Sequence, residues 1–197
     1  MNWMKDGTEV QKPAVVSGRQ CGSCTVCCKI LPIHTEELRK TANLLCRHCD
    51  EGRGCRIYDK RPAVCRSFYC EWRLNPQIPA TWRPDKTGIF IDRIAREHIE
   101  EIPEGYAADF AISFMLFRRE AIDRPAVSET IADYVSRRVA TFLTIPGPAG
   151  HLPAQIFLNE FLENAVAKRD FAAIMVTLRQ ALAALSRQEF ERVPDFN

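Results

Sequence analysis

The sequence lacks several features that mark common classes of protein. No apolar run approaches the roughly 18 residues of a membrane-spanning helix, and residues 1–7 lack the apolar core of a secretory signal. There is no G-x-G-x-x-G sequence and no phosphate-binding loop, so nucleotide or S-adenosylmethionine binding of the Rossmann type has no support. Internal repeats and low-complexity tracts are absent as well. We therefore expect a cytoplasmic protein with no membrane partner.

An excess of charge of one sign is also missing. The 197 residues include 27 Lys or Arg and 25 Asp or Glu, for a net charge of +2. So small a surplus gives no strong reason to expect a nucleic-acid partner. Aromatic residues lie near the cysteines, and in a zinc ribbon such residues can bind nucleic acid. We favour the other interpretation, that these aromatic side chains cover a metal site. These residues are Tyr58, Phe68, Tyr69, Trp72 and Trp82.

Cysteine is absent from residues 1–20 and 71–197, yet nine cysteines fall between residues 21 and 70. Packing alone does not explain such clustering, whereas soft metals and metal–sulfur clusters prefer thiolate ligands. In a reducing compartment a dense cysteine pattern indicates metal or redox chemistry rather than disulfides, and the odd number points the same way. The predicted metal ligands are Cys21, Cys24, Cys27, Cys28, Cys46, Cys49, Cys55, Cys65 and Cys70.

The number of cysteines limits the kind and number of metal sites that the chain can form. A structural zinc site takes four nitrogen or sulfur ligands, and an iron–sulfur cluster takes four cysteines. The sequence thus predicts zinc or an iron–sulfur cluster in one or two sites, with one thiol to spare in the two-site case. Because consecutive side chains diverge, we expect Cys27 and Cys28 to serve different metals, or one of them to remain unligated. His34 and His48 are weaker candidates, since enough cysteines lie nearby.

Basic residues are also concentrated near the cysteines. Between residues 21 and 70 there are nine Lys or Arg and five Asp or Glu, a surplus of four positive charges before the thiolates are counted. A divalent ion held by four thiolates carries a net charge of −2, so two such sites would offset the surplus. As a set, we expect five arginines to stabilise thiolates, although each alone is typical of a solvated face. They are Arg47, Arg53, Arg56, Arg61 and Arg66.

Two cysteine blocks resemble a known family. The first is the C-x-x-C-x-x-C-C run of residues 21–28, and the second is residues 54–70, GCRIYDKRPAVCRSFYC. Over roughly residues 19–72 they are similar to the YkgJ-type cysteine-cluster family, described as a zinc- or iron-chelating domain. The resemblance implies metal binding by these cysteines. A similar cysteine pattern occurs in flagellin lysine methylases, which implies one enzymatic alternative.

Two functional hypotheses follow. The first is a metal-binding protein that uses zinc or an iron–sulfur centre for a structural, regulatory or metal-handling purpose. The alternative is an iron–sulfur-dependent enzyme, such as a protein-modifying transferase similar to a lysine methylase. No catalytic residue is identified, because residues 76–197 carry no motif of a known function and His151 lies alone in a loop sequence. The sequence leaves open whether the protein is an enzyme.

The fold class expected is α+β. We predict a loose arm over residues 1–20, an irregular metal-bound unit over 21–75 and a small α+β region over 76–197. The metal-bound unit is expected to pack on the sheet and helices of that region. The last two helices carry an apolar stripe that predicts core packing or a homodimer interface, and another protein partner stays open.

Local patterns predict the individual elements. In the N-terminal part they indicate a helix from Thr35 to Leu45 and a linker over residues 75–85. In the C-terminal part they indicate strands at 89–91, 98–102, 110–116 and 141–145, a helix capped by Ser128, and helices at 157–166 and 171–185.

Overall fold

The computed structural model describes residues 14–95 and 105–193, which divide into two compact units. The first, called the cysteine unit, comprises residues up to Thr87 together with the later segments Gly147–Leu152 and 190–193. The second, called the sheet unit, comprises the described parts of Gly88–Pro146 and Pro153–Glu189. Both helices and strands are present, so the chain is of the α+β class, as predicted.

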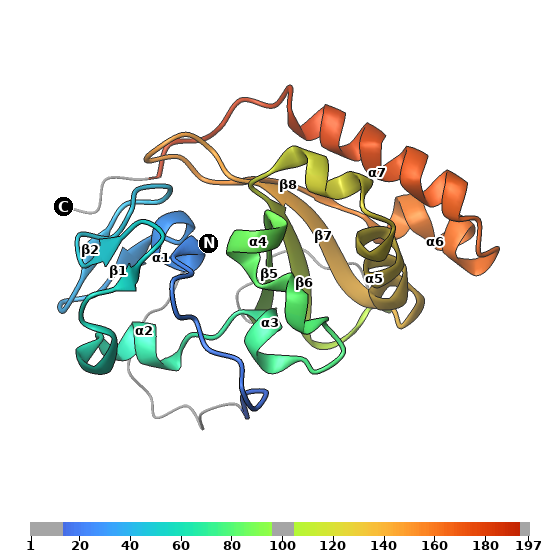
Figure 1. Cartoon of the computed structure of the whole chain (residues 1–197). Coiled ribbons are helices and arrows are strands. Elements are labelled where there is room, and N and C mark those ends of the chain that lie inside the picture. The colour runs from blue at the N-terminus through green and yellow to red at the C-terminus, as the bar shows by residue number, and fades with distance from the viewer. Residues whose placement is uncertain (1–13, 96–104, 194–197) are drawn as a thin grey trace. The chain divides into compact units, whose positions relative to one another are not determined.

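The cysteine unit contains only short elements (Figure 1). Two antiparallel pairs of two-residue strands, β1–β2 and β3–β4, lie among single helical turns. In chain order its elements are α1 (Val26–Ile30), β1 (Ile33–His34), β2 (Arg39–Lys40), β3 (Cys49–Asp50), β4 (Gly54–Cys55), η1 (Tyr58–Lys60), α2 (Ala63–Ser67), α3 (Glu71–Leu74), η2 (Ala80–Trp82) and α4 (Pro84–Thr87). Regular structure is sparse, as short metal-binding knuckles would require.

The helix predicted from Thr35 to Leu45 is wrong, because this segment forms the β1–β2 hairpin. Thr35 does accept a hydrogen bond from a backbone N–H three residues later, that of Leu38, at 3.1 Å. However, the Thr35 N–H also donates to the Leu38 carbonyl at 3.0 Å, which closes a tight turn. Such local side-chain bonds compete with a helix for the same backbone groups. Leu38 and Ala42 are buried as their spacing indicated, but Leu38 lies in the turn of the hairpin and Ala42 lies after β2.

The linker predicted over residues 75–85 is also more ordered than expected. It contains η2 and the start of α4, and its first residues are held by Arg19. The Arg19 guanidinium donates to the carbonyls of Asn75 at 2.9 Å and Ile78 at 2.6 Å. The linker was predicted from its prolines, and that pattern gives no information about hydrogen bonds from a distant side chain. Of the predicted N-terminal arm, residues 1–13 lie outside the described residues.

The sheet unit is built on a four-stranded sheet in the order β5-β6-β7-β8. β6 pairs in parallel with β7, while the two outer pairs are antiparallel. The parallel pair needs a crossover connection, which η4 and α5 supply. The elements are β5 (Ile89–Ala95), β6 (Ala107–Leu116), η4 (Arg119–Asp123), α5 (Pro125–Ser136), β7 (Val139–Ile145), β8 (Ala154–Phe157), α6 (Asn159–Ala167) and α7 (Phe171–Leu185).

Most predicted elements of this unit are confirmed. The strands at 89–91, 110–116 and 141–145 and the helix at 171–185 are present, while the strand at 98–102 lies outside the described residues. The helix expected at Ser128 begins at Pro125, whose fixed φ suits a first helical turn, and the Ser128 hydroxyl donates to the Pro125 carbonyl. The helix predicted over residues 157–166 begins at Asn159, because Phe157 is the last residue of strand β8.

Three helices pack together beside the sheet. Figure 1 shows α5, α6 and α7 gathered next to β7, every residue of which is buried. Asn159 joins helix and strand, because its buried side chain accepts from the Thr141 N–H at 2.8 Å and donates to the Val139 carbonyl at 2.9 Å. On α7, Ile174 and Leu178 face the core, so the apolar stripe serves core packing. The homodimer stays a prediction.

Among the helices of the described residues, none is long and apolar enough to cross a membrane.

Candidate functional site

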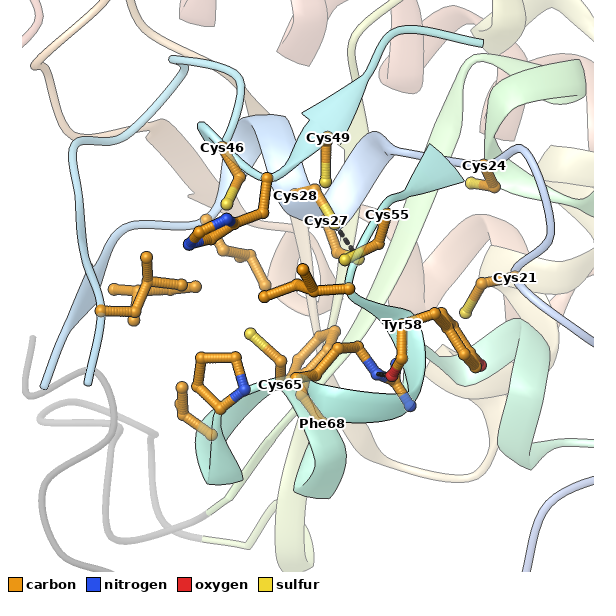
Figure 2. A pocket seen from close by; sticks show the side chains of 18 of the residues that line it. Cys21, Cys24, Cys27, Cys28, Cys46, Cys49, Cys55, Tyr58, Cys65 and Phe68 are labelled. Carbon is orange, nitrogen blue, oxygen red and sulfur yellow. Dashed lines mark hydrogen bonds between the residues drawn. The ribbon is translucent and has the colours of Figure 1, made fainter. Parts of the chain in front are cut away.

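All nine predicted ligands line one cavity of the cysteine unit, with a volume of about 80 Å³ (Figure 2). A single water molecule needs about 10–15 Å³ of such space, so the cavity has room for more than one ion or for a polynuclear group. All nine are described residues, and all are thiols rather than disulfides. The lining cysteines are Cys21, Cys24, Cys27, Cys28, Cys46, Cys49, Cys55, Cys65 and Cys70.

Local turns and short elements present these thiols. The Cys24 N–H donates to the Cys21 carbonyl at 2.9 Å, which closes the first C-x-x-C turn. Cys49 and Cys55 are direct cross-strand partners in the β3–β4 pair. Partners in an antiparallel pair project their side chains on the same face of the ribbon. The hairpin therefore presents the thiols of Cys49 and Cys55 side by side. The spacing of the two residues in the sequence did not predict this pairing.

A glycine allows two cysteine segments to meet. Gly54 has a φ of +104°, and a Cβ at this position would lie 2.4 Å from the carbonyl oxygen of Gly22. Only a residue without a side chain fits this conformation and this approach. The turn that carries Cys21 and Cys24 thus lies against the hairpin that carries Cys49 and Cys55. Both cysteine blocks reach the cavity because Gly54 permits this contact.

Aromatic rings complete much of the lining. Tyr58, Phe68 and Tyr69 all border the cavity. The Arg61 guanidinium stacks over the Tyr58 ring, 3.7 Å from its centroid, and this arginine also lines the cavity. Three of the five aromatic residues singled out in the sequence therefore border the cavity, while the Trp72 indole is buried and donates to the Ala80 carbonyl at 3.1 Å.

Lys40 places a buried positive charge close to several thiols. Its Nζ donates to the carbonyls of Lys29, Thr41 and Leu44 at 2.9, 3.0 and 3.0 Å. Burial lowers the pKa of Lys40 to about 8, although attraction to the neighbouring thiols, Cys46 first, opposes the shift. An ammonium that is fixed in this way favours the thiolate form of its neighbours.

Arg73 is a second buried cation at the cavity. Its side chain is only 7% exposed, and its Nη1 donates to the Cys21 sulfur at 3.4 Å. Burial acts to lower the pKa of Arg73, but hydrogen bonds to Tyr58 and Cys21 outweigh it and the pKa is raised. The Nε atom is buried with no hydrogen-bond partner among the described residues. Such orphaned donors are rare in folded proteins.

The adjacent thiols Cys27 and Cys28 have opposite tendencies. Their sulfur atoms lie 4.0 Å apart. A hydrogen bond from Cys27 lowers the pKa of Cys28 to about 6, with help from Cys49, Lys40 and Arg61 and against the effect of burial. The same hydrogen bond raises the pKa of Cys27, and burial raises it further. The pair therefore favours a thiolate on Cys28 beside a neutral thiol on Cys27.

Other thiols of the cavity favour the neutral form. Burial is the first cause that raises the pKa of Cys24 and of Cys49, and it raises the pKa of Cys65 to about 11. Neighbouring thiols add to the shift at all three positions. A bound cation reverses this tendency, because it stabilises thiolates directly. Nine thiols around one cavity, two of them buried and seven partly buried, are stable as a set of anions only with added positive charge.

The arginines predicted from the sequence mostly do not reach the cavity. Arg61 lines it, but Arg47 donates to His48 and Arg56 donates to the Arg47 carbonyl at 2.6 Å. Arg66 bonds the Arg61 carbonyl, and Arg53 is exposed. His48 borders the cavity, whereas His34 is exposed in β1.

Sequence reasoning missed Lys40 and Arg73. Arg73 follows Cys70 by one turn of α3, and its backbone N–H donates to the Cys70 carbonyl at 2.8 Å. That spacing was an available signal. Lys40 offers no such signal, since its position depends on the β1–β2 hairpin.

Across residues 14–95 and 105–193, no three His, Cys, Asp or Glu side chains are arranged so that they could hold a metal ion. The thiols share a cavity without converging on one point. What the fold brings together is therefore a lining of cysteines and not a formed ligand set.

Comparison with known proteins identifies no family. No family model matches the chain, and neither a curated protein nor a solved structure does. The similarity to the YkgJ-type cysteine-cluster family stays a prediction from the two cysteine blocks.

Proposed function

We propose that this protein binds zinc or an iron–sulfur centre through the cysteines between residues 21 and 70, in the reducing environment of the cytoplasm. One observation carries the proposal: nine thiols that lie up to 49 residues apart in the sequence (70 minus 21) line a single cavity. Apolar packing would not select cysteine at every one of these positions, whereas thiolate ligation does.

The charges around the cavity support this proposal. Lys40, Arg61 and Arg73 lie at or near the thiols, and the first and last of them are buried. Buried cations need buried anions as partners. Centres made of four thiolates and a divalent ion, or a four-iron cluster, carry negative charge that these side chains offset.

Ligation requires the sulfurs to draw together from the positions they have in the cavity. A cysteine sulfur moves by rotation about χ1 alone, with three staggered positions. In a tetrahedral site with Zn–S bonds of about 2.3 Å, the four sulfurs lie about 3.8 Å from one another. The rearrangement we infer is one of side chains, with the backbone turns retained.

The test is the metal and acid-labile sulfide content of full-length protein purified without oxygen or added metal, together with its absorption spectrum. We expect bound zinc, or iron with sulfide and broad visible absorption. The control is a variant in which Cys24 and Cys49 are both replaced by serine, which should lose metal. Wild-type metal content in that variant, or a wild-type protein without metal, contradicts the proposal.

The enzymatic alternative, an iron–sulfur-dependent protein-modifying transferase, stays a prediction of the sequence resemblance. Iron with sulfide in the experiment above would favour it. Zinc alone would favour a structural or metal-handling role.

A further inference from the structure

Building on the proposed function, we infer that the cysteines form two separate thiolate centres, divided between Cys27 and Cys28. The first, called the arginine centre, contains Cys21, Cys24, Cys27 and Cys70 beside Arg73. The second, called the hairpin centre, contains Cys28, Cys46, Cys49, Cys55 and Cys65 beside Lys40.

Packing defines the hairpin centre. Cys46 and Cys49 are buried in one apolar cluster with Leu38, and the three other cysteines of the centre pack against that cluster. Backbone bonds hold the same residues, because the Cys46 N–H donates to the Cys28 carbonyl and the Cys49 N–H to the Cys46 carbonyl. None of the four cysteines of the arginine centre belongs to this cluster. The five thiols thus form one neighbourhood.

Arg73 defines the other centre. Its guanidinium donates to the Cys21 sulfur at 3.4 Å, and its backbone N–H donates to the Cys70 carbonyl at 2.8 Å. One residue therefore joins cysteines that are far apart in the sequence. The Cys24 N–H donates to the Cys21 carbonyl at 2.9 Å, which keeps Cys24 in the same turn. Cys27 is within electrostatic range of Cys21 and Cys70, although its strongest interaction is with the adjacent Cys28. Figure 2 shows Cys21 and Cys24 at one side of the cavity, away from Cys46 and Cys65.

The division falls inside α1. Consecutive residues of a helix point about 100° apart, given 3.6 residues per turn. Cys27 and Cys28 therefore face different parts of the cavity, although their sulfurs are 4.0 Å apart (dashed line in Figure 2). This geometry suits an arrangement in which Cys27 is a ligand of the arginine centre and Cys28 is a ligand of the hairpin centre. Two centres that share this helical turn would lie next to each other.

The buried Arg73 Nε is the observation that points to a ligand in the arginine centre. It has no acceptor among the described residues, in a side chain more than nine-tenths buried. Buried N–H groups are nearly always hydrogen-bonded. A thiolate drawn toward a metal, or the inorganic sulfide of a cluster, is an acceptor of the right charge. Four thiolates with a divalent ion carry a charge of −2, which the guanidinium partly offsets.

The experiment compares single variants of full-length protein purified without oxygen. Cys24→Ser should lose about half of the bound metal and keep the remainder, and Cys49→Ser should lose the other half. The double variant should lose nearly all of it. If either single variant loses all of the metal, or if wild-type protein holds only one centre, the division is wrong. A wild-type protein without metal overturns the proposed function itself, which is a different result.

A second measurement does not depend on ligand loss. Removal of metal by a chelator should be biphasic in wild-type protein, with one phase missing in Cys24→Ser and the other in Cys49→Ser. Arg73→Gln should accelerate about tenfold only the phase that Cys24→Ser lacks, and Arg73→Lys should restore part of the wild-type rate. Acceleration of both phases, or of neither, rejects the assignment of Arg73 to one centre. Hydrogen exchange in β6 and β7 reports whether the sheet unit of each variant is folded, and exchange around Leu38 and Trp72 reports on the cysteine unit.

Discussion

The two units of this protein stabilise their folds in different ways. In the sheet unit, strands of four to ten residues and α-helices of nine to fifteen bury apolar side chains such as Phe114, Leu143 and Leu178 completely. In the cysteine unit, the strands have two residues and the α-helices four or five. Its buried interior contains Cys46, Cys49 and two cations, Lys40 and Arg73.

The difference leads to a prediction of where each unit obtains its stability. Burial of apolar surface contributes about 25 cal/mol per Å², and long amphipathic elements supply that surface to the sheet unit. Short turns supply much less of it. Small cysteine-rich modules instead gain folding free energy from metal binding. The comparison therefore predicts one unit that depends on metal and one that does not.

Removal of metal should have the largest effect and should be confined to one unit. Structural zinc contributes about 10–16 kcal/mol to small modules, so treatment with a strong chelator should abolish hydrogen-exchange protection around Cys46 and Cys49. Amides of β6 and β7 should keep theirs. Equal loss in both units, or no loss in either, would contradict the comparison.

Truncation of an apolar side chain in the core should destabilise the sheet unit and leave metal binding by the cysteine unit unchanged. Leu178→Ala, at a fully buried position of α7, should lower the free energy of unfolding of the sheet unit by about 2–5 kcal/mol, because it leaves a cavity. Val176→Ala on the same helix is the control, since that side chain is 51% exposed and should change stability little. Denaturant unfolding measures both, and metal content should be unchanged. Loss of metal in Leu178→Ala would show that the units are coupled.

The contact between the cysteine segments is open to a smaller test. Gly54→Ala forces a side chain into a positive φ and against the Gly22 carbonyl, so it should destabilise the cysteine unit by about 1–3 kcal/mol. Gly52→Ala is the matched control in the same hairpin, because Gly52 also has a positive φ but no atom within 4 Å of a Cβ. Chelator-induced release of metal should be faster in Gly54→Ala than in Gly52→Ala. Equal rates would mean that the contact is unimportant.

The smallest expected effect is an alkaline loss of stability in the sheet unit that is independent of metal. The Tyr106 hydroxyl donates to Glu163 at 2.6 Å, and this hydrogen bond raises the pKa of Tyr106 to about 12. A raised folded-state pKa gives stability that is complete below the unfolded value of about 10 and is lost as pH rises toward 12. Tyr106→Phe should remove that part of the pH dependence. An unchanged slope between pH 10 and 12 in thermal unfolding would refute this assignment.

Residues close together in the sequence determined much of the outcome. Alternation over residues 110–116 and the 3.6-residue period over 171–185 predicted β6 and α7, because each pattern is a property of one segment that buries one face. The density of cysteines between residues 21 and 70 likewise singled out the candidate site, since all nine line one cavity. In the segment from Thr35 the same kind of reasoning failed, because hydrogen bonds between Thr35 and Leu38 close a hairpin turn in place of a helical turn.

Only the tertiary structure decided how the thiols are grouped and which cations accompany them. Arg73 meets the Cys21 sulfur across 52 residues of sequence, and Gly54 meets Gly22 across 32 (54 minus 22). Lys40 reaches three carbonyls because a hairpin, and not a helix, carries it. Contacts of this kind depend on loop closure and on side chains that bond distant backbone groups. The pattern of residues along the sequence does not predict such contacts. It does predict strands and helices, because their periodicity is a property of neighbouring residues.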